Sequence, residues 1–292
     1  FRMNLMEKTI LYGNGVNLLG CGPSWNTLLQ KISNKSLLPP IQSNTLKYEY
    51  IILPQDENKK IYLKDDDLNF LCDEEGNRMV FDINRESEIK ENLCQELEKQ
   101  KPSYFYDLLV ELNADNYITT NYELFLPKML LATNPDTKNP LYRCRISKKY
   151  GQHKTFWNIH GDTENPDSVI LGLSDYCQNV VQIDNYLKQP KGQKCWIDLF
   201  FNTDIHILGL AMGYEEIDIW NVLTSRKRKR RKNTEECKNS IYYYAIQDDS
   251  FDSGKKELLK ALDVNVVDIE FDWSNNAYKK AYEKIFNNIK MR

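Results

Sequence analysis

Residues 9–15 read TILYGNG, a short apolar run that ends in two glycines with one asparagine between them. A helix start is expected near Pro23-Ser24, because the apolar residues behind this pair recur at the spacing of one helix face. These apolar residues are Trp25, Leu28, Leu29 and Ile32. A strand, a glycine turn and a helix in this order are typical of the first βα unit of a parallel sheet.

The glycine turn has two explanations. Glycines between a strand and a helix let backbone N–H groups approach a pyrophosphate, which would place Gly13, Asn14, Gly15 and Asn17 at a bound cofactor. The same glycines also suit a tight turn that binds nothing. A nicotinamide dehydrogenase is disfavoured, because Leu18 stands where its third glycine belongs and no acidic residue follows about 20 positions on.

Short apolar runs recur along the rest of the chain, and helical stretches separate them. The runs cover residues 117–121, 156–159, 168–171, 205–208, 241–246 and 264–269, and helices are expected at about 103–112 and 276–289. Strands of a parallel sheet have this apolar character because helices cover both faces. We therefore predict an α/β fold with a Rossmann-like, mostly parallel sheet flanked by helices.

Residues 41–102 have a different composition, being polar, charged and rich in Asn, Asp, Glu and Lys. Short apolar runs occur at 51–53 and 79–81, and Ile89, Leu93 and Leu97 indicate an amphipathic helix. We expect a helical or irregular insertion, or a cap, after the first βα unit. A single domain would then span residues 1–292 and carry this insertion.

The charge balance of the whole chain gives no reason to expect nucleic-acid binding. Of the 292 residues, 41% are hydrophobic and 28% charged, and the net charge is −3. One basic run, Arg226–Lys232 (RKRKRRK), departs from this balance. We expect it to be a solvated loop, with contact to nucleic acid or to an acidic partner surface as the less favoured alternatives.

The seven cysteines include no Cys-x-x-Cys pair, which indicates reduced thiols in a cytoplasmic protein. A zinc site of four cysteines lacks its usual spacing, so no metal is expected. No stretch approaches the ~20 apolar residues of a membrane span, and residues 1–8 do not resemble a signal peptide.

Two strand ends carry side chains that are suited to chemistry. Asn121 ends the run YITTN, where an amide can orient a ribose hydroxyl or a water, although an asparagine also commonly ends a strand in a turn. His160 follows the run FWNI and precedes Gly161, so its ring can face a cleft as a general base. We assign His206 to the core and His153 to a solvated loop.

Read in chain order, these features resemble the sirtuin-like (silent information regulator type) domain. The family has a Gly-x-Gly turn after its first strand, a Thr-x-Asn after a middle strand and then a His-Gly, as in GNG, TTN and HG here. The stretches 13–32, YITTNYE, 157–176 and 206–220 resemble the bacterial sirtuin-like proteins of antiphage defence more than they resemble the protein deacetylases. The resemblance covers most of the chain outside the insertion.

The resemblance implies an NAD pocket in which NAD is the substrate. The glycine turn would hold the pyrophosphate, and Gly209 would approach a ribose or phosphate. Asn121 would position the nicotinamide ribose and a water, and His160 would act as the base. Thr120 and Gly161, beside these two residues, are counted among the cofactor-binding residues.

The chain departs from the sirtuin deacetylases at several positions. The four-cysteine zinc module is not visible, the Asn-x-Asp motif is Asn121-Tyr122-Glu123, and the late Gly-Ser pattern is Gly209-Leu210-Ala211. These departures favour an NAD glycohydrolase over an NAD-dependent protein deacylase. A non-catalytic module that binds NAD or ADP-ribose is a third interpretation.

The expected role is NAD depletion in antiphage abortive infection. An unrestrained NAD hydrolase would harm its host, and the chain shows no convincing separate sensor domain. We therefore expect control by homo-oligomerisation or by a partner protein, such as a HerA-type motor ATPase or an argonaute-like sensor. No membrane partner is expected.

Overall fold

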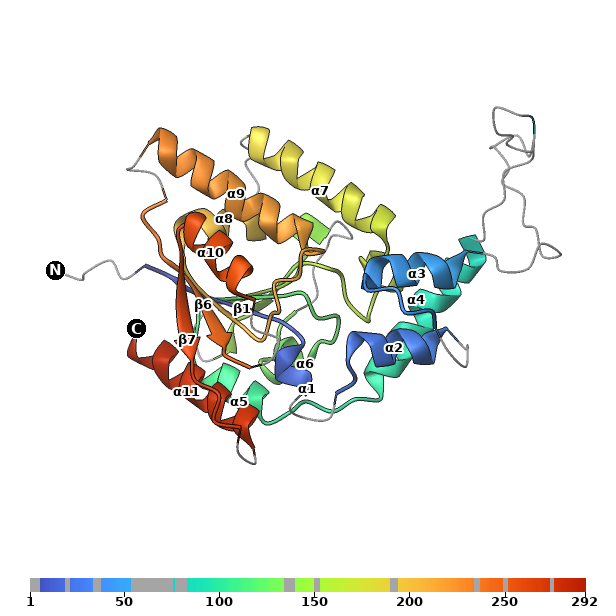
Figure 1. Cartoon of the computed structure of the whole chain (residues 1–292), viewed down its shortest axis with the longest axis horizontal. Coiled ribbons are helices and arrows are strands. Elements are labelled where there is room, and N and C mark those ends of the chain that lie inside the picture. Colours follow the sequence, from blue (N-terminus) through green and yellow to red (C-terminus); the bar gives the residue numbers. More distant parts are fainter. Residues whose placement is uncertain are drawn as a thin grey trace.

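The computed structural model describes residues 6–18, 22–33, 38–53, 76, 83–133, 140–149, 153–189, 194–233, 237–248, 252–273 and 276–292. Within these residues, seven strands form one sheet in the order β3-β4-β2-β1-β5-β6-β7 (Figure 1). Every neighbouring pair is parallel except β3–β4, so β3 is an antiparallel edge strand. The predicted α/β class with a mostly parallel sheet is confirmed.

The strands are β1 (Lys8–Tyr12), β2 (Asn116–Thr119), β3 (Cys144–Ser147), β4 (Lys154–Asn158), β5 (Asp204–Leu208), β6 (Ile241–Ile246) and β7 (Val264–Ile269). The helices before β3 are α1 (Gly15–Leu18), α2 (Trp25–Ile32), α3 (Asn44–Ile52), α4 (Ile83–Glu98), α5 (Phe105–Glu111) and α6 (Phe125–Met129). Those after β4 are α7 (Leu173–Lys188), α8 (Trp196–Asn202), α9 (Ile217–Lys232), α10 (Ser253–Ala261) and α11 (Ala277–Met291). Two short 3₁₀ helices span Pro140–Tyr142 and Pro166–Ser168.

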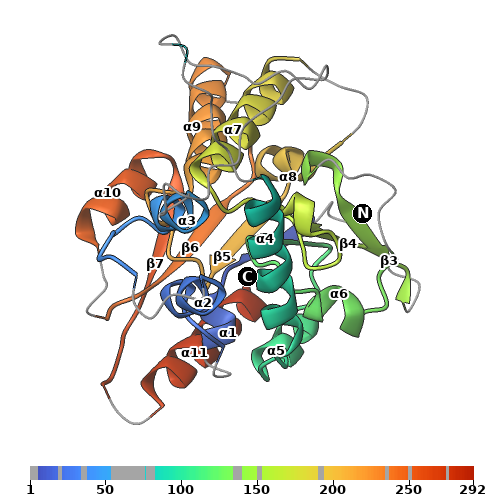
Figure 2. The ribbon, with the colours of Figure 1, turned by 90° about the vertical axis from the view of Figure 1, so that its right-hand side faces the viewer.

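Alternation along β1 shows how the two faces of the sheet are filled. Leu11 packs with α7, α8, α9 and α10 on one face, whereas Ile10 and Tyr12 pack with α1, α5, α6 and α11 on the other. Successive strand side chains point to opposite faces, and all three residues are buried. Helices therefore cover both faces, as Figures 1 and 2 show.

Helices α2, α3 and α4 form a third hydrophobic cluster beside the sheet. Leu29, Tyr48 and Leu93 are fully buried in it, and Tyr122 and Leu171 join it from the loops that follow β2 and β4. Figure 2 places these three helices in front of the sheet. The helix starts at Trp25 as predicted, because the Ser24 side chain accepts a hydrogen bond from the Thr27 N–H.

Helix α4 includes the predicted amphipathic helix around Ile89, Leu93 and Leu97. In the run at 51–53, the first two residues end α3 and Leu53 is the residue that caps this helix, so the run is not a strand. Residues 79–81 lie outside the described residues, as do Cys21 and Cys72. The interpretation of 41–102 as an insertion or cap stays a prediction.

The apolar run at 168–171, which the sequence suggested as a strand, is not one. Pro166–Ser168 is a 3₁₀ helix, and the following residues are irregular. Val169 and Leu171 are nevertheless buried, because they pack against the α2–α4 cluster. The apolar character thus reflects burial beneath helices and not pairing in the sheet.

The basic run Arg226–Lys232, expected as a solvated loop, forms the last turns of α9. Cations suit this position because the end of a helix exposes unpaired carbonyl groups. Arg226 is fully buried, and its Nη2 donates to the backbone carbonyl and the side chain of Asn239. Lys227 pairs with Asp263, whereas Arg228, Arg231 and Lys232 are exposed.

His206 belongs to the core, as expected. Its ring stacks against Tyr242 and Tyr244, and its Nδ1 lies 2.9 Å from the Tyr244 hydroxyl. Burial, followed by the positive charges of Lys8 and Arg292, lowers the pKa of His206 to about 4.

This lowered pKa predicts how stability depends on pH. An unfolded histidine has a pKa of about 6.5, so the unfolded chain binds more protons between pH 4 and 6.5. The contribution of neutral His206 is complete above that range and is lost as the pH falls through it. As the pH falls from 6.5 to 4, the free energy of unfolding of the wild type should therefore decrease by about 3 kcal/mol more than that of His206→Asn. Urea unfolding across pH measures the difference, with exposed His153→Asn as the control; equal losses in all three proteins would contradict the assignment.

Candidate functional site

A cavity of about 600 Å³ lies at the carboxyl ends of β1, β5 and β6, where a parallel sheet usually meets its ligand. The expected cofactor residues Asn14, Gly15, Thr120 and Gly209 line it. Aromatic and apolar side chains form much of the remaining wall, from Leu18, Trp25, Leu210, Tyr243, Tyr244, Ile246, Tyr278 and Tyr282. Its size lies within the range of ligand pockets.

The turns after β1 and β5 pack backbone against backbone. The N–H of Gly15 donates to the carbonyl of Gly209 at 2.8 Å, and that of Gly13 to Leu208 at 3.2 Å. A Cβ on Gly15 would lie 2.2 Å from the Tyr282 hydroxyl, and one on Gly13 would lie 2.8 Å from the Gly209 oxygen. Gly209 itself has φ +63°. Close packing therefore requires these glycines whether or not a ligand binds.

Asn17, which was expected at the cofactor, is buried and does not line this cavity. Its Nδ2 donates to Oε1 of Glu123 at 2.8 Å, and the same oxygen accepts from Nδ2 of Asn121 at 2.8 Å and from the Tyr106 hydroxyl at 2.6 Å. Glu123 is buried, so these three donors compensate its lost hydration. The acid that replaces the family's aspartate thus holds an expected cofactor residue and an expected catalytic residue in place.

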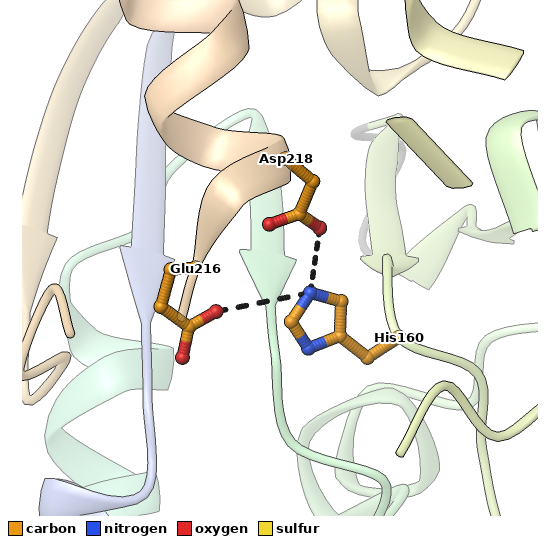
Figure 3. Close-up of side chains that lie close together, drawn as sticks. All are labelled: His160, Glu216 and Asp218. Carbon is orange, nitrogen blue, oxygen red and sulfur yellow. Dashed lines mark hydrogen bonds and ion pairs between the residues drawn. The ribbon is translucent and has the colours of Figure 1, made fainter. Parts of the chain in front are cut away.

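His160 follows β4 and is only 2% exposed. Its Nε2 lies 2.7 Å from Oδ2 of Asp218 (Figure 3). Its Nδ1 lies 3.4 Å from the Tyr176 hydroxyl. The imidazole borders a small cavity of about 60 Å³ that Thr120 and Glu216 also line. The structure therefore orients the ring with a buried carboxylate.

Asp218 lies at the start of α9 and is fully buried. Besides His160, its Oδ2 accepts from Nδ2 of Asn179 at 3.1 Å, and its Oδ1 accepts from the Ile219 N–H at 2.8 Å. Burial disfavours the charged imidazolium, but the charge of Asp218 and its hydrogen bond outweigh this and raise the pKa of His160.

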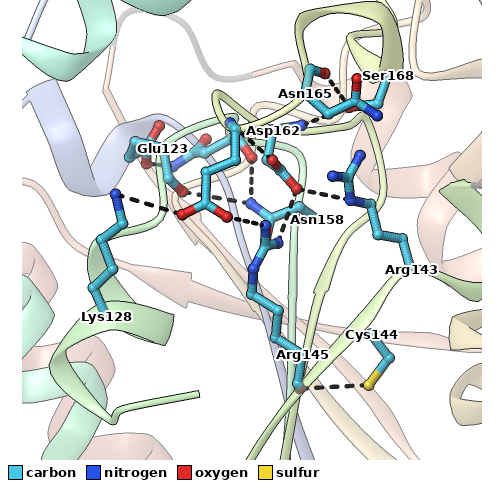
Figure 4. A network of polar contacts seen from close by, with 11 residues as sticks. Glu123, Lys128, Arg143, Cys144, Arg145, Asn158, Asp162, Asn165 and Ser168 are labelled. Atoms are coloured by element: carbon cyan, nitrogen blue, oxygen red, sulfur yellow. Dashed lines mark hydrogen bonds and ion pairs between the residues drawn. The ribbon is translucent and has the colours of Figure 1, made fainter. Parts of the chain in front are cut away.

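The loop that follows His160 in the sequence is held in place by a glycine conformation and by buried ion pairs. Gly161 has φ +86°, and a Cβ there would lie 2.1 Å from the carbonyl oxygen of Ser168. Buried Asp162 receives a hydrogen bond from Nη1 of Arg145 at 2.8 Å, and Nε of Arg143 lies 3.0 Å from the same oxygen (Figure 4). Gly161, expected at the cofactor, thus has a conformational reason to be glycine, and it lines neither the 600 Å³ cavity nor the 60 Å³ cavity.

Asn121 and His160 border separate small cavities that share the side chains of Trp25 and Tyr122 as walls. Trp25 also lines the larger cavity. Asn158, at the end of β4, donates through Nδ2 to the Asn121 carbonyl at 3.0 Å and so joins the two strand ends. One group of cavities at one edge of the sheet therefore collects six of the predicted residues: Asn14, Gly15, Thr120, Asn121, His160 and Gly209. Gly13, Asn17 and Gly161 do not line these cavities.

Sequence reasoning missed Glu216, Asp218, Tyr176 and Asn179 at this site. Asp218 is 58 residues from His160, and acidic residues at a helix start are common for reasons of helix stability. The stretch 206–220 carries part of the family resemblance, but nothing in its spacing indicates that its acids face a histidine.

Comparison with known proteins gives one family match. A model described as a SIR2-like domain matches residues 115–267, just over half of the chain. NAD(+) hydrolase ThsA of Bacillus cereus (strain MSX-D12) is 22% identical over 312 residues, which cover 100% of this chain and 57% of that protein. The chain thus spans little more than half the length of this relative.

The buried ion pairs of Asp162 predict a large effect on stability. Asp162→Asn removes the charge that faces two buried guanidinium groups, so the variant should lose roughly 3 kcal/mol of unfolding free energy. Glu164, whose side chain is 35% exposed, pairs with Arg145 at the rim, and Glu164→Gln should cost less than about 1 kcal/mol. Urea unfolding compares the two variants, and similar losses would show that the ion pairs do not anchor the loop.

The pair of His160 and Asp218 can be tested by proton NMR, because the chain has only three histidines. In the wild type, the pKa of His160 should lie above its ordinary value and that of His206 below it. In Asp218→Asn the ring stays buried without its counter-charge, so the pKa of His160 should fall. His153 serves as the internal reference, and an unchanged His160 titration would rule out the pair.

Proposed function

Because the chain belongs to the SIR2-like domain family, we propose that it binds NAD in the 600 Å³ cavity and hydrolyses the bond between nicotinamide and ribose. One observation carries this proposal. The side chains of Asn121 and His160 lie at strand ends beside the glycine-lined cavity, and each is oriented by a buried carboxylate. The hydrolase activity named for the Bacillus cereus relative supports the same reaction.

The proposed substrate fits the wall of the cavity. The aromatic side chains Tyr243, Tyr278 and Tyr282 offer flat apolar surface to an adenine and its ribose. Gly15 and Gly209 line this cavity, so a pyrophosphate in it can approach the backbone of the two turns. Thr120 lines both the larger cavity and the small cavity of His160.

The chemistry requires little covalent help from the protein. The C1′–N bond breaks with its electron pair passing to the cationic pyridinium, which becomes neutral nicotinamide. The ribose develops oxocarbenium character, and water supplies the new C1′–O bond. Asn121 orients the ribose and the water, while the imidazole of His160 acts as a base on water or on a ribose hydroxyl. The long contact from Nδ1 to Tyr176 makes Nδ1 the nitrogen that a substrate would engage.

A role in antiphage defence, and control by homo-oligomerisation or a partner protein, stay predictions from the sequence. Cytoplasmic location is likewise a prediction. Among the described helices, none combines the length and the apolar character that crossing a membrane requires.

The direct test is to incubate the purified chain with NAD and to quantify nicotinamide and ADP-ribose. Asn121→Ala and His160→Ala should each lower NAD cleavage by about 100-fold or more, as expected for loss of a positioning group or a general base. His153→Ala, which changes an exposed histidine, is the control and should retain the wild-type rate. Nicotinamide release that requires an acyl-lysine peptide would favour a deacylase instead, and near-normal turnover in either variant would remove that residue from the mechanism.

A further inference from the structure

Glu216 lines both the cavity proposed for NAD and the small cavity beside His160. The residues that line both cavities are Trp25, Thr120 and Glu216, and of these only Glu216 can exchange a proton near neutral pH. It caps the start of α9, two residues before Asp218. A substrate in the larger cavity would therefore meet the Glu216 carboxyl group before it met the imidazole.

The carboxyl group of Glu216 also lacks the partners that its neighbours have. Its Oε2 is buried, has no hydrogen-bond donor and lies 3.9 Å from Nε2 of His160, which is already bonded to Asp218 (Figure 3). Asp218 has donors on both oxygens, and both oxygens of Glu215 accept from the Asn44 N–H. Buried oxygens are rarely left unpaired, so this one calls for a proton or a ligand.

The charges around Glu216 suit proton exchange. Burial raises its pKa, His160 opposes that effect, and the carboxylates of Asp218 and Glu215 add to it, which brings the pKa to about 7. Tyr176 and Tyr122 line the same small cavity as this carboxyl group. A carboxyl group with a pKa near neutrality can both take and return a proton during turnover.

We propose that Glu216 is a further catalytic residue, the base that deprotonates the attacking water. The water oxygen forms the bond to C1′, the C1′–N bond breaks toward nicotinamide, and the proton passes to the Glu216 carboxylate. Nδ1 of His160 then engages a ribose hydroxyl, while Asp218 holds the imidazole from behind. This division of roles rests on the proposed NAD hydrolysis.

The kinetic test compares Glu216→Gln and Glu216→Asp with the wild type from about pH 5 to pH 9. Glu216→Gln should lower kcat by about 100-fold or more and abolish the rise of kcat with pH near neutrality, whereas Glu216→Asp should recover part of both. The dissociation constant for ADP-ribose should change by less than about threefold, because the fold of the cavity is kept. Glu257→Gln removes one negative charge from an exposed, distant carboxylate and should match the wild type throughout.

The possible outcomes separate the two proposals. If the wild type hydrolyses NAD and Glu216→Gln keeps its kcat and its pH profile, the role of Glu216 is wrong and the proposed function stands. If the wild type releases no nicotinamide, both fall. A Glu216→Gln variant that also loses ADP-ribose binding would make Glu216 a structural residue and overturn its catalytic role.

Thermal unfolding supplies a readout that does not depend on activity. A carboxyl group whose pKa rises from 4.5 to about 7 on folding contributes stability at low pH that is lost as the pH rises through this window. Glu216→Gln should therefore melt at a higher temperature than the wild type at about pH 8, and the gain should disappear toward about pH 4. A lower melting temperature at about pH 8 would show that the carboxylate stabilises the fold and would contradict a role as a strained base.

Discussion

The buried carboxylate of Asp218 is the constraint on which the rest of the site depends. A charge with no exposure is tolerated only when donors satisfy its oxygens, and Asp218 obtains them from three elements. The imidazole of His160 comes from the loop after β4, the amide of Asn179 from α7, and a backbone N–H from α9 itself. The Asp218 carboxylate thereby connects α7, α9 and the loop after β4. The orientation of the imidazole is therefore set before any substrate enters.

Two other buried carboxylates act in the same way around the site. Glu123 gathers Asn17, Asn121 and Tyr106, and Asp162 faces Arg143 and Arg145. Each of these carboxylates fixes the polar groups around it in one arrangement. Burying the charge costs desolvation free energy that an apolar residue at the same position would not cost. Glu216 differs from these acids because one of its oxygens is buried without a donor. The site thus combines satisfied carboxylates that give rigidity with one unsatisfied carboxylate where reaction is proposed.

Sequence patterns located the strands at the centre of the sheet because these are buried on both faces and must be apolar. The same signal failed at 168–171, where burial comes from helices α2–α4 and not from strand pairing. The prediction of a solvated loop at Arg226–Lys232 was also wrong, because the charge of this run does not reveal that it is helical or that Arg226 is buried. The sirtuin-like motifs correctly indicated the family. Asn121 and His160 were expected at the site because they follow strands, whereas Asp218 and Glu216 come from a distant helix start that only the folded chain brings near.

The position of Tyr282 has a consequence for the order in which a working pocket arises during synthesis. Tyr282 lies on α11, the last helix described, yet its hydroxyl closes the space between the glycine turns after β1 and β5. The first and last residues that line the pocket, Asn14 and Tyr282, are therefore about 270 positions apart in the sequence. A chain still being translated, or one cut short before α11, has the histidine and the asparagine but an open cavity wall. The ribosome must release the chain at least through α11 before the binding surface exists, which delays ligand capture until this helix has packed.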